Sequence, residues 1–486
     1  MATRFVTLLL VLYVLKQIFT VAAFYPFSGH DEVAHYAYIR QLVDERRLPV
    51  LPDLASWRAS LVGSEPPPID QIPDDLYPYC RFTLDWYCEP NNPRWARNPP
   101  RIVTVPGYGY FPSGYQYVAN HPPLYYILVS PVLAATQGLS LLSQQYALRL
   151  AAIPFGLLTV FAAYRMTRTL FPGDAFLAVT VPAAVAFQPQ ISYEAAMINN
   201  DIVAIAIVAV LLWGIVVACR DRFPVRLSVM LGAGLGLGLL AKSTVIAVAP
   251  VIGLAMLAIL GWRNWKIVLA RGSAIGIPAA LLTGPWYVYL HRTYGDFNGL
   301  DRVAALQYWN SPMGRFAELL LSPDFAIGRF RETWGEYGWR LIHYSDRLLW
   351  ALAIPVVLSL IGLLIYAFKV VRGVDHAESD VVERPSRWQQ VALGALALTC
   401  VLAYLAVVQF GTEFALSQAR YFFPAAGAAA LLGMLGLRTL VPRHYRFIGQ
   451  GVIFGSLVVM NLVIYFAYVL PFTAGFDQPY YWTWGG

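Results

Sequence analysis

Apolar runs about as long as a membrane-spanning helix recur along most of the chain. A helix needs about 20 residues to cross the hydrocarbon core of a bilayer, and eleven runs of roughly that length occur among the 486 residues. They lie at about 5–24, 147–164, 174–190, 199–219, 227–241, 243–261, 272–290, 347–367, 390–410, 421–437 and 447–470. Because 58% of the residues are hydrophobic and 13% are charged, a water-soluble globule is excluded. We predict an all-α polytopic membrane protein with one integral domain over residues 1–486.

A shorter apolar run at 124–137 directly follows the diproline Pro122-Pro123. We expect it to lie at or dip into the interface, and the positive-inside rule agrees. With eleven spans and a cytoplasmic N-terminus, the basic loop residues all face the cytoplasm, whereas a twelfth span would put Arg165 and Arg168 outside. These residues are Arg4, Arg165, Arg168, Arg220, Arg222, Arg226, Arg263, Lys266, Arg271, Lys369, Arg372, Arg384, Arg387, Arg438, Arg443 and Arg446.

This orientation gives the outer side of the membrane two large segments, at 25–146 and 291–346, and shorter ones at 411–420 and 471–486. The chemistry is expected there. The first run is read as an anchor, because no small-residue cleavage site is evident after it. The formal charge of +7 is explained by the cytoplasmic loops and does not indicate nucleic-acid binding. The composition of the spans favours a bacterial plasma (inner) membrane.

Two adjacent carboxylates, Asp31 and Glu32, lie just beyond the first run, within FSGHDEVAHYAY. Their position at a membrane exit indicates a reaction site. The residues that follow place His35, Tyr38 and Leu42 at helical spacing, which predicts an amphipathic helix resting on the outer surface and ending at Pro49. That helix either covers a cleft for a lipid-borne head group or packs on the bundle without a part in chemistry.

Two polar clusters flank later runs. His121 precedes the stiff diproline and the interfacial Tyr125 and Tyr126, and it is either held toward a ligand or part of a structural entry to the interfacial helix. Asn199-Asn200-Asp201 opens a span, where Asp201 either caps the helix or contributes to a site.

Two cations lie at the outer ends of spans. Arg420, in QARYFFPA, can bind phosphate oxygens with two parallel hydrogen bonds, although an interfacial arginine also snorkels to lipid head groups. Lys242 lies in a tight turn between two spans. An ionisable group near membrane depth is costly, which favours function at both positions.

Cys80 and Cys88 lie in the first outer segment, where an oxidising compartment would favour a disulfide over two unpaired thiols. The glycines of LGAGLGLGLLAK resemble a nucleotide loop, but they fall within an apolar run and indicate close helix packing instead. A soluble nucleotide donor is therefore disfavoured, and an energised substrate on the outer face would be linked to a lipid.

Taken together, these motifs resemble the GT-C membrane glycosyltransferases. The resemblance rests on four motifs: Asp31-Glu32 after the first span, HPPLYY before the second, NND at the start of the fourth and the late QARYFFPA. The dolichyl-phosphate-mannose protein mannosyltransferases and the bacterial lipid A aminoarabinose transferases are the nearest in pattern. The resemblance implies a GT-C-like bundle, a catalytic carboxylate on the first outer loop and a sugar donor on a polyprenyl phosphate. The segment 50–118 matches no such member, so the acceptor stays open among glycan, lipid and protein.

The implied reaction assigns roles to these residues. Asp31 would take the proton of the acceptor hydroxyl, while Arg420 and then Lys242 would neutralise the departing phosphate. Glu32 and His121 would orient the acceptor, the phosphate or a divalent cation. Tyr125, Asn200 and Asp201 are counted with the substrate-binding residues. A single displacement would invert the anomeric configuration of a transferred hexosyl or pentosyl group.

Two other functions fit a basic protein with many spans. A lipid or solute transporter would show inverted repeats and broken mid-membrane helices, which the sequence does not. A polysaccharide polymerase or ligase would use a diphosphate-linked oligosaccharide and would suit several outer arginines better than one Asp-Glu pair. The glycosyltransferase is the favoured interpretation.

Overall fold

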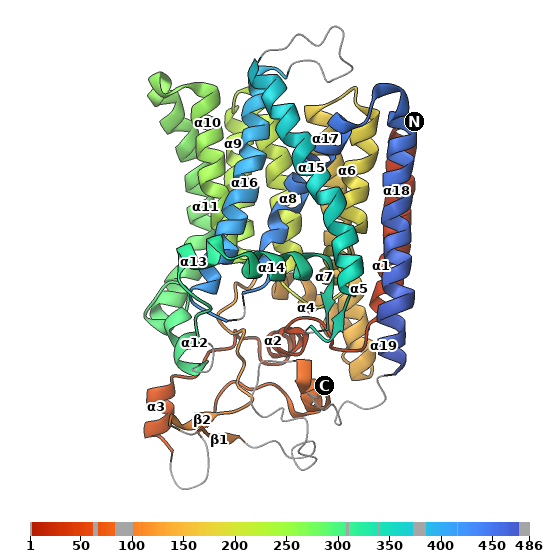
Figure 1. Ribbon diagram of the computed structural model, residues 1–486. Helices are drawn as coiled ribbons and strands as arrows, with labels where there is room; N and C mark the ends of the chain where they lie inside the picture. Colours follow the sequence, from red (N-terminus) through yellow and green to blue (C-terminus); the bar gives the residue numbers. More distant parts are fainter. Residues whose placement is uncertain are drawn as a thin grey trace.

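The protein is an all-α helical bundle with a loop-rich layer at one end, as the computed structural model in Figure 1 shows. The structure describes residues 2–61, 67–82, 101–105, 107–307, 311–338, 340–372, 385–415 and 417–475. The long helices are α1 (Ala2–Ala23), α5 (Leu141–Leu170), α8 (Asp201–Asp221), α10 (Val248–Leu260, after η2 Ser243–Ala247), α11 (Trp265–Tyr294, after η3 Trp262–Asn264), α15 (Asp346–Arg372), α16 (Arg387–Gly411), α17 (Ala426–Leu440, after η4 Ala419–Ala425) and α18 (Arg446–Val463, after η5 Arg443–Tyr445 and continued by η6 Ile464–Val469 and α19 Leu470–Ala474).

All eleven predicted runs contain helix, and the prediction of an all-α polytopic membrane protein is confirmed. Within the part of the chain that the structure describes, nine helices are long and apolar enough to cross a membrane. The other two predicted spans are the shorter α6 (Ala175–Phe187) and α9 (Val225–Ala241), of 13 and 17 residues. The run predicted to be interfacial forms α4 (Leu124–Thr136), which is also 13 residues long.

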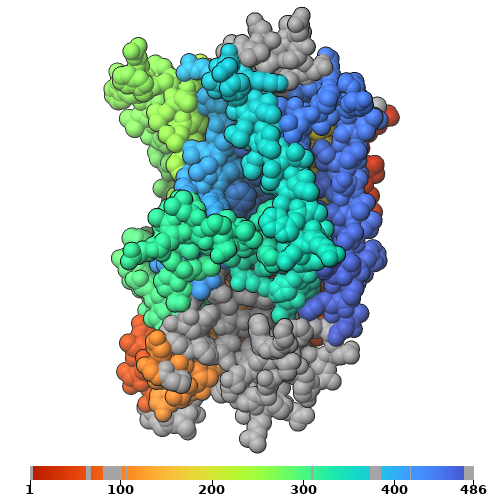
Figure 2. Space-filling model, in the orientation of Figure 1, coloured from red at the N-terminus to blue at the C-terminus, as the bar shows by residue number. Residues whose placement is uncertain are grey.

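Helix α8 occupies the centre of the bundle. It packs against α5, α9, α10, α16 and η4, and its apolar residues from Ile202 to Cys219 are largely buried. Around it, α15 packs on α17, and α16 packs on α10, α17 and η4. Figure 2 shows the surface hollowed between α15 and α16. The first residue of α8 and the residues of η4 therefore meet inside the bundle near its loop-rich end.

Glycines permit a close contact between α9 and α11. A Cβ at Gly232 would overlap the carbonyl oxygen of Ile275, and one at Gly236 would lie 3.0 Å from the Cβ of Leu282. Two helix backbones can approach this closely only where the residue at the contact point has no side chain. The interpretation of LGAGLGLGLLAK as a packing motif is confirmed.

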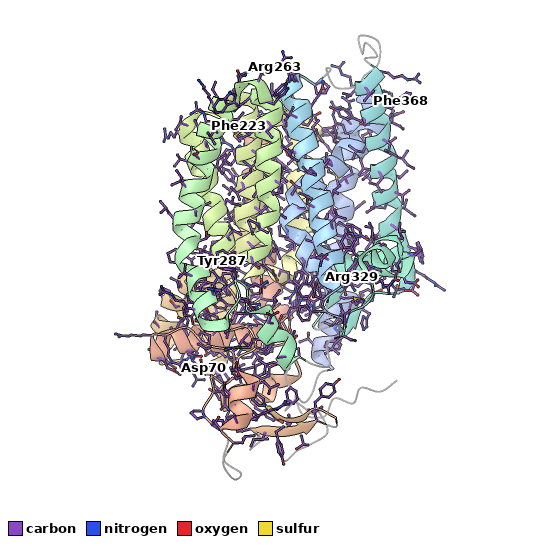
Figure 3. All side chains as sticks on the ribbon, turned by 90° about the vertical axis from the view of Figure 1, so that its left-hand side faces the viewer. Asp70, Phe223, Arg263, Tyr287, Arg329 and Phe368 are labelled. Atoms are coloured by element: carbon purple, nitrogen blue, oxygen red, sulfur yellow. The ribbon has the colours of Figure 1, made fainter. Side chains whose placement is uncertain are left out.

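The loop-rich layer gathers the short elements at one end of the bundle (Figure 1). They are α2 (Glu32–Glu45), α3 (Leu54–Ala59), η1 (Asp74–Phe82), α12 (Leu300–Leu306), α13 (Phe316–Leu321), α14 (Pro323–Gly335) and two antiparallel hairpins, β1 (Ile102–Val105) with β2 (Gly109–Pro112) and β3 (Glu336–Tyr337) with β4 (Ile342–His343). Figure 3 places Asp70 at this end, and Arg263 and Phe368 at the opposite one.

The expectation for α2 was wrong in two respects. Its first two turns are buried on all sides, with Val33, Ala34 and Tyr38 each fully covered, so it does not rest on a surface. It ends at Glu45, because Arg46 adopts a left-handed conformation (φ 55°). The end expected at Pro49 lies four residues further along the chain.

The predicted Cys80–Cys88 disulfide lies outside the described residues, because the segment 83–100 and the side chain of Cys80 are not described.

Candidate active site

Asp31 occupies a strained position between α1 and α2. It adopts left-handed backbone angles (φ 56°), which few residues other than glycine take without a compensating reason. Its carbonyl oxygen accepts the first bond of α2, from the amide of His35 at 2.9 Å. Its side chain makes no capping hydrogen bond and is directed instead into the bundle, toward η4.

A buried ion pair joins Asp31 to Arg420, 389 residues later. The guanidinium Nη2 of Arg420 donates to Oδ2 of Asp31 at 2.7 Å, and the two side chains are only 8% and 7% exposed. The other carboxylate oxygen, Oδ1, is buried and has no hydrogen-bond partner among the described residues. Asp31 thus keeps one oxygen available to accept a proton.

The pair continues into a row of four alternating charges. Asp201 lies between the two cations, with its Oδ2 at 3.5 Å from Nη1 of Arg420 and its Oδ1 paired with the ammonium of Lys242. The ring of Tyr421 covers both cations, 4.7 Å from Lys242 Nζ and 5.6 Å from Arg420 Cζ. We call Asp31, Arg420, Asp201 and Lys242 the charge row.

The charge row sets the ionisation of Asp31. Burial alone would raise the pKa of the Asp31 carboxyl, but the Arg420 guanidinium outweighs burial and holds that pKa below its ordinary value. Asp31 is therefore an ionised carboxylate at neutral pH.

Two histidines and two tyrosines line the neighbouring side of the site. The Tyr126 hydroxyl lies 2.8 Å from Nδ1 of His35 and 3.4 Å from Nδ1 of His121, and the Tyr126 ring stacks on Tyr38 at 3.6 Å. Burial lowers the pKa of His35 to about 3 and that of His121 to about 4. Both imidazoles are therefore neutral at physiological pH and can exchange hydrogen bonds without adding charge.

Tyr125 and Tyr126 were expected in an aromatic belt at the interface, and this was wrong. Both side chains are fully buried, and their rings meet edge to face at 5.4 Å. Tyr125 also packs 6.5 Å from the ring of His35, so it lies in the wall of the site rather than against lipid head groups.

The structure places Glu32 away from the role expected for it. Arg149 binds it with two hydrogen bonds of 2.7 Å, one to each carboxylate oxygen, and both side chains are 0% exposed. The amides of Gly29 and Ile198 and the side chain of Gln145 fill its remaining acceptor positions. Glu32 has no free lone pair with which to orient an acceptor, a phosphate or a metal ion.

Arg149 is a structural residue that sequence reasoning missed. Besides Glu32, its guanidinium donates to the carbonyl oxygens of Val21, Phe24 and Tyr25, where α1 ends. It thereby fixes both ends of the turn that carries Asp31. The signal was a lone arginine at the start of the apolar run 147–164, since buried charges in membrane segments are costly without a partner.

The three residues of the Asn199-Asn200-Asp201 motif make different contacts. The side chain of Asn199 accepts from the amide of Ile202 at 3.1 Å and so caps α8, while Asn200 donates to the carbonyl of Ala241 at the end of α9. Asp201 is thereby left to the cations of the charge row. Asn200, expected to bind substrate, ties α8 to α9 through its amide nitrogen.

A second pair next to the charge row also escaped the sequence analysis. His30, the residue before Asp31, holds its Nδ1 at 3.1 Å from Oε1 of Glu194 in α7 (Pro189–Glu194), and the Glu194 side chain is fully buried. The signal was a carboxylate in the short polar gap between two apolar runs.

A divalent cation held by Glu32 and His121 is not supported by the donor set. Among the described residues, no group of three or more His, Cys, Asp or Glu side chains could hold a metal ion. Glu32 is bound by Arg149, and His121 contacts Tyr126.

Comparison with known proteins identifies a related family. A family model described as dolichyl-phosphate-mannose-protein mannosyltransferase matches residues 120–289, which include His121, Asp201 and Lys242 but neither Asp31 nor Arg420. The resemblance stated from the sequence motifs is thereby confirmed over this stretch. Among curated proteins, no sequence matches the chain.

Two kinds of solved structure resemble the whole chain. The apo oligosaccharyltransferase of Archaeoglobus fulgidus is 13% identical, with 99% of this chain and 56% of that chain covered and a TM-score of 0.49. ArnT from Cupriavidus metallidurans bound to undecaprenyl phosphate is 14% identical, with 99% and 76% covered and a TM-score of 0.47. The present chain spans little more than half the length of the oligosaccharyltransferase. At this identity and TM-score, neither likeness indicates an activity or a substrate.

Proposed function

We propose that this protein transfers a hexosyl or pentosyl group from a polyprenyl-phosphate donor to a hydroxyl of a glycan, lipid or protein acceptor. The observation that carries the proposal is the pairing of Asp31 with Arg420 inside a membrane bundle. A proton acceptor with one free oxygen lies beside a guanidinium suited to phosphate. The family match over residues 120–289 supports the same class of reaction.

The charge row accounts for both halves of the transfer. As the acceptor oxygen forms its bond to the anomeric carbon, its proton passes to Oδ1 of Asp31, which is ionised and unbonded. The bond from the anomeric carbon to the phosphate oxygen breaks, and its electron pair leaves with the polyprenyl phosphate. Arg420 and Lys242 stabilise the negative charge on that phosphate, because both cations are already positioned in the site before the reaction.

The donor phosphate would compete with Asp31 for Arg420. Nη2 of Arg420 is bound to Asp31 and its Nε is buried without a hydrogen-bond partner among the described residues, so a phosphate oxygen can take up these donors. Release from Arg420 strengthens Asp31 as a base, because the carboxylate loses its stabilising cation. Displacement from the face opposite the phosphate inverts the anomeric configuration.

The neighbouring groups would complete the site. The neutral His121 and His35 offer hydrogen bonds to sugar or acceptor hydroxyls, and Asp201 holds Lys242 and Arg420 next to each other through its two carboxylate oxygens. Glu32 keeps the Asp31 turn in shape through Arg149 and does not touch the reactants.

The loop-rich end is proposed to face the outer side of a bacterial plasma membrane, with the N-terminus in the cytoplasm. The basic residues of the short loops support this orientation, since Arg263 lies at the end opposite Asp70 (Figure 3). The hollow between α15 and α16 (Figure 2) supports lateral access from the bilayer for a lipid-linked donor.

Transfer of radiolabelled sugar from a panel of polyprenyl-phosphate sugars tests the proposal, in membranes containing wild type or Asp31→Asn. We expect incorporation by the wild type and a loss of about 10²-fold or more in the variant, the usual contribution of a positioned base. Asp75→Asn, which alters an exposed ion pair with Arg40, should keep full activity. Incorporation from diphosphate-linked oligosaccharides alone would replace the monophosphate proposal.

A further inference from the structure

A carboxylate from the second loop segment holds the backbone immediately before Arg420. Oε2 of Glu332, in α14, accepts from the amide of Ala419 at 2.8 Å, and Glu332 is only 7% exposed. Ala419 opens η4, so its amide is one of the donors that the start of a helical segment leaves without an internal partner. The cap comes from a residue 87 positions earlier in the chain.

The other oxygen of Glu332 is anchored by two cations. Nη2 of Arg329 donates to Oε1 at 2.9 Å, and Arg340 pairs with the same oxygen. Arg340 also reaches the carbonyl of Ser417 at 3.5 Å. Figure 3 shows Arg329 where the bundle meets the loop-rich layer. The carboxylate is therefore fixed from one side while its free oxygen is directed at Ala419.

The turn that Glu332 holds is buried throughout. Ser417, Gln418, Ala419 and Arg420 are all at most 8% exposed, and the Ser417 hydroxyl is bound to the carbonyl of Val407. A buried turn without its acceptor would move to satisfy the Ala419 amide elsewhere. Because the Arg420 side chain contacts Asp31 at 2.7 Å, a displacement of about 1 Å at its backbone would break that contact.

We infer that Glu332 is a positioning residue that holds Arg420 against Asp31 through the Ala419 amide. The inference rests on the proposed function, because it assigns Glu332 to the same reaction site. It gives the second loop segment, far from Asp31 in the sequence, a defined task in catalysis.

Helix α14 has other attachments, which allow Glu332 to be changed without releasing the helix. Gln188 donates to the carbonyl of Thr333, and Gln190 donates to that of Glu336 at 3.3 Å. Ser322 caps the first turn of α14 by accepting from Phe325.

The acid limb of the pH profile of kcat/KM reports on the contact between Arg420 and Asp31. Among its neighbours Arg420, His35 and His30, Arg420 lowers the pKa of the Asp31 carboxyl most, and Arg420 is the one whose backbone Glu332 holds. When Arg420 moves away, its effect on the carboxyl weakens and the pKa of Asp31 rises. Activity is then lost at a higher pH as the solution is acidified.

Three substitutions at Glu332 separate the effect of side-chain length from the effect of side-chain charge. Glu332→Ala removes the acceptor, and Glu332→Asp keeps the charge but shortens the side chain by about 1.5 Å, one carbon–carbon bond. Both should lower kcat/KM and move the acid limb upward by about one pH unit, the lower end of the usual effect of a nearby cation. Glu332→Gln keeps the length and one acceptor oxygen, so its acid limb should stay nearest to that of wild type.

Glu336→Gln is the matched control, since Glu336 follows Glu332 by four residues and contacts Arg340 and His343. An unchanged acid limb in both Glu332→Ala and Glu332→Asp would overturn the inference, even if protein yield fell. So would an equal shift in Glu336→Gln. If Glu332→Ala does not accumulate, the comparison of Asp with Gln decides alone. Full activity of Asp31→Asn would instead refute Asp31 as the base, and no incorporation by the wild type from any polyprenyl-phosphate sugar would refute the proposed function itself.

Discussion

Asp31 combines three features that cost stability. Its backbone is left-handed, its carboxylate is charged and buried, and its Oδ1 lacks a hydrogen bond within the described structure. An unsatisfied buried acceptor costs about 1–3 kcal/mol, and a left-handed residue other than glycine costs a similar amount. Arrangements of this kind persist where function requires them, which is why Asp31 rather than the well-satisfied Glu32 is assigned to the chemistry.

Replacing Arg420 by Gln should shift the acid limb of activity toward neutral pH. In the wild type the guanidinium depresses the pKa of Asp31, so the base stays ionised and active as the pH falls. Without it, burial raises that pKa, and activity present at neutral pH is lost earlier on acidification. A nearby cation typically shifts an Asp by about 1–3 units. The measurement is kcat/KM against pH, together with the KM for donor, which should rise.

Arg47→Gln is the matched control for this experiment, because the half-exposed Arg47 pairs with Glu45 and Asp70, which are outside the charge row. An Arg420→Gln enzyme with the wild-type acid limb would separate the two residues functionally and contradict the role given to their contact.

At the scale of elements, the apolar runs predicted where helices form, because a span of about 20 apolar residues has few alternatives in a membrane. They did not predict which polar groups would meet. Asp31 and Arg420 both drew attention, but nothing in their local sequence joins positions 389 residues apart. The role of Arg149 was not predicted, because its partner, Glu32, had been assigned to the reaction site. The burial of α2 was missed for a related reason, since its polar face meets buried partners such as Tyr126 instead of water.

The Glu32–Arg149 pair should be required for the stability of the α1–α2–α5 junction. Glu32→Gln leaves the fully buried guanidinium without its counter-charge, a change that typically costs about 3–5 kcal/mol. We expect a clear fall in the thermal unfolding temperature in detergent. Glu45→Gln, at the exposed end of the same helix, should have little effect. The double variant Glu32→Gln, Arg149→Met should regain part of the loss, and an additive loss would argue against direct coupling.

The contact of α9 with α11 should not tolerate replacement of Gly232 by a residue with a side chain. Gly232→Val would place a branched side chain against the Ile275 backbone, and the helices would have to separate. The expected result is lower thermal stability and less monodisperse protein on gel filtration. Gly284→Ala, in α11, is the control, since a Cβ there meets nothing within 4 Å. Equal behaviour of the two variants would contradict the close packing.

On the scale of the whole molecule, the bundle assembles one site from segments spread over most of the chain. The charge row takes one residue each from the α1–α2 turn, η4, the start of α8 and the end of α9. All four positions lie at the ends of helices, so the packing of α8 at the bundle centre fixes their separation. The orientation of the bundle in the membrane then decides on which side the proposed reaction would occur.

That orientation predicts which end of the bundle is accessible from outside the cell. In a background lacking the four native cysteines, Glu45→Cys lies in the loop-rich layer and Arg263→Cys lies at the opposite end, and both positions are exposed. An impermeant thiol reagent added to intact spheroplasts should label Glu45→Cys and should reach Arg263→Cys only after the membrane is permeabilised. The reason is that Arg and Lys residues near the ends of spans are retained on the cytoplasmic side, and Arg263 is close in the sequence to Lys266 and Arg271, which lie in the first turns of α11. The reverse labelling pattern would put the charge row on the cytoplasmic face, where a lipid-linked donor would have to be presented from the inner leaflet.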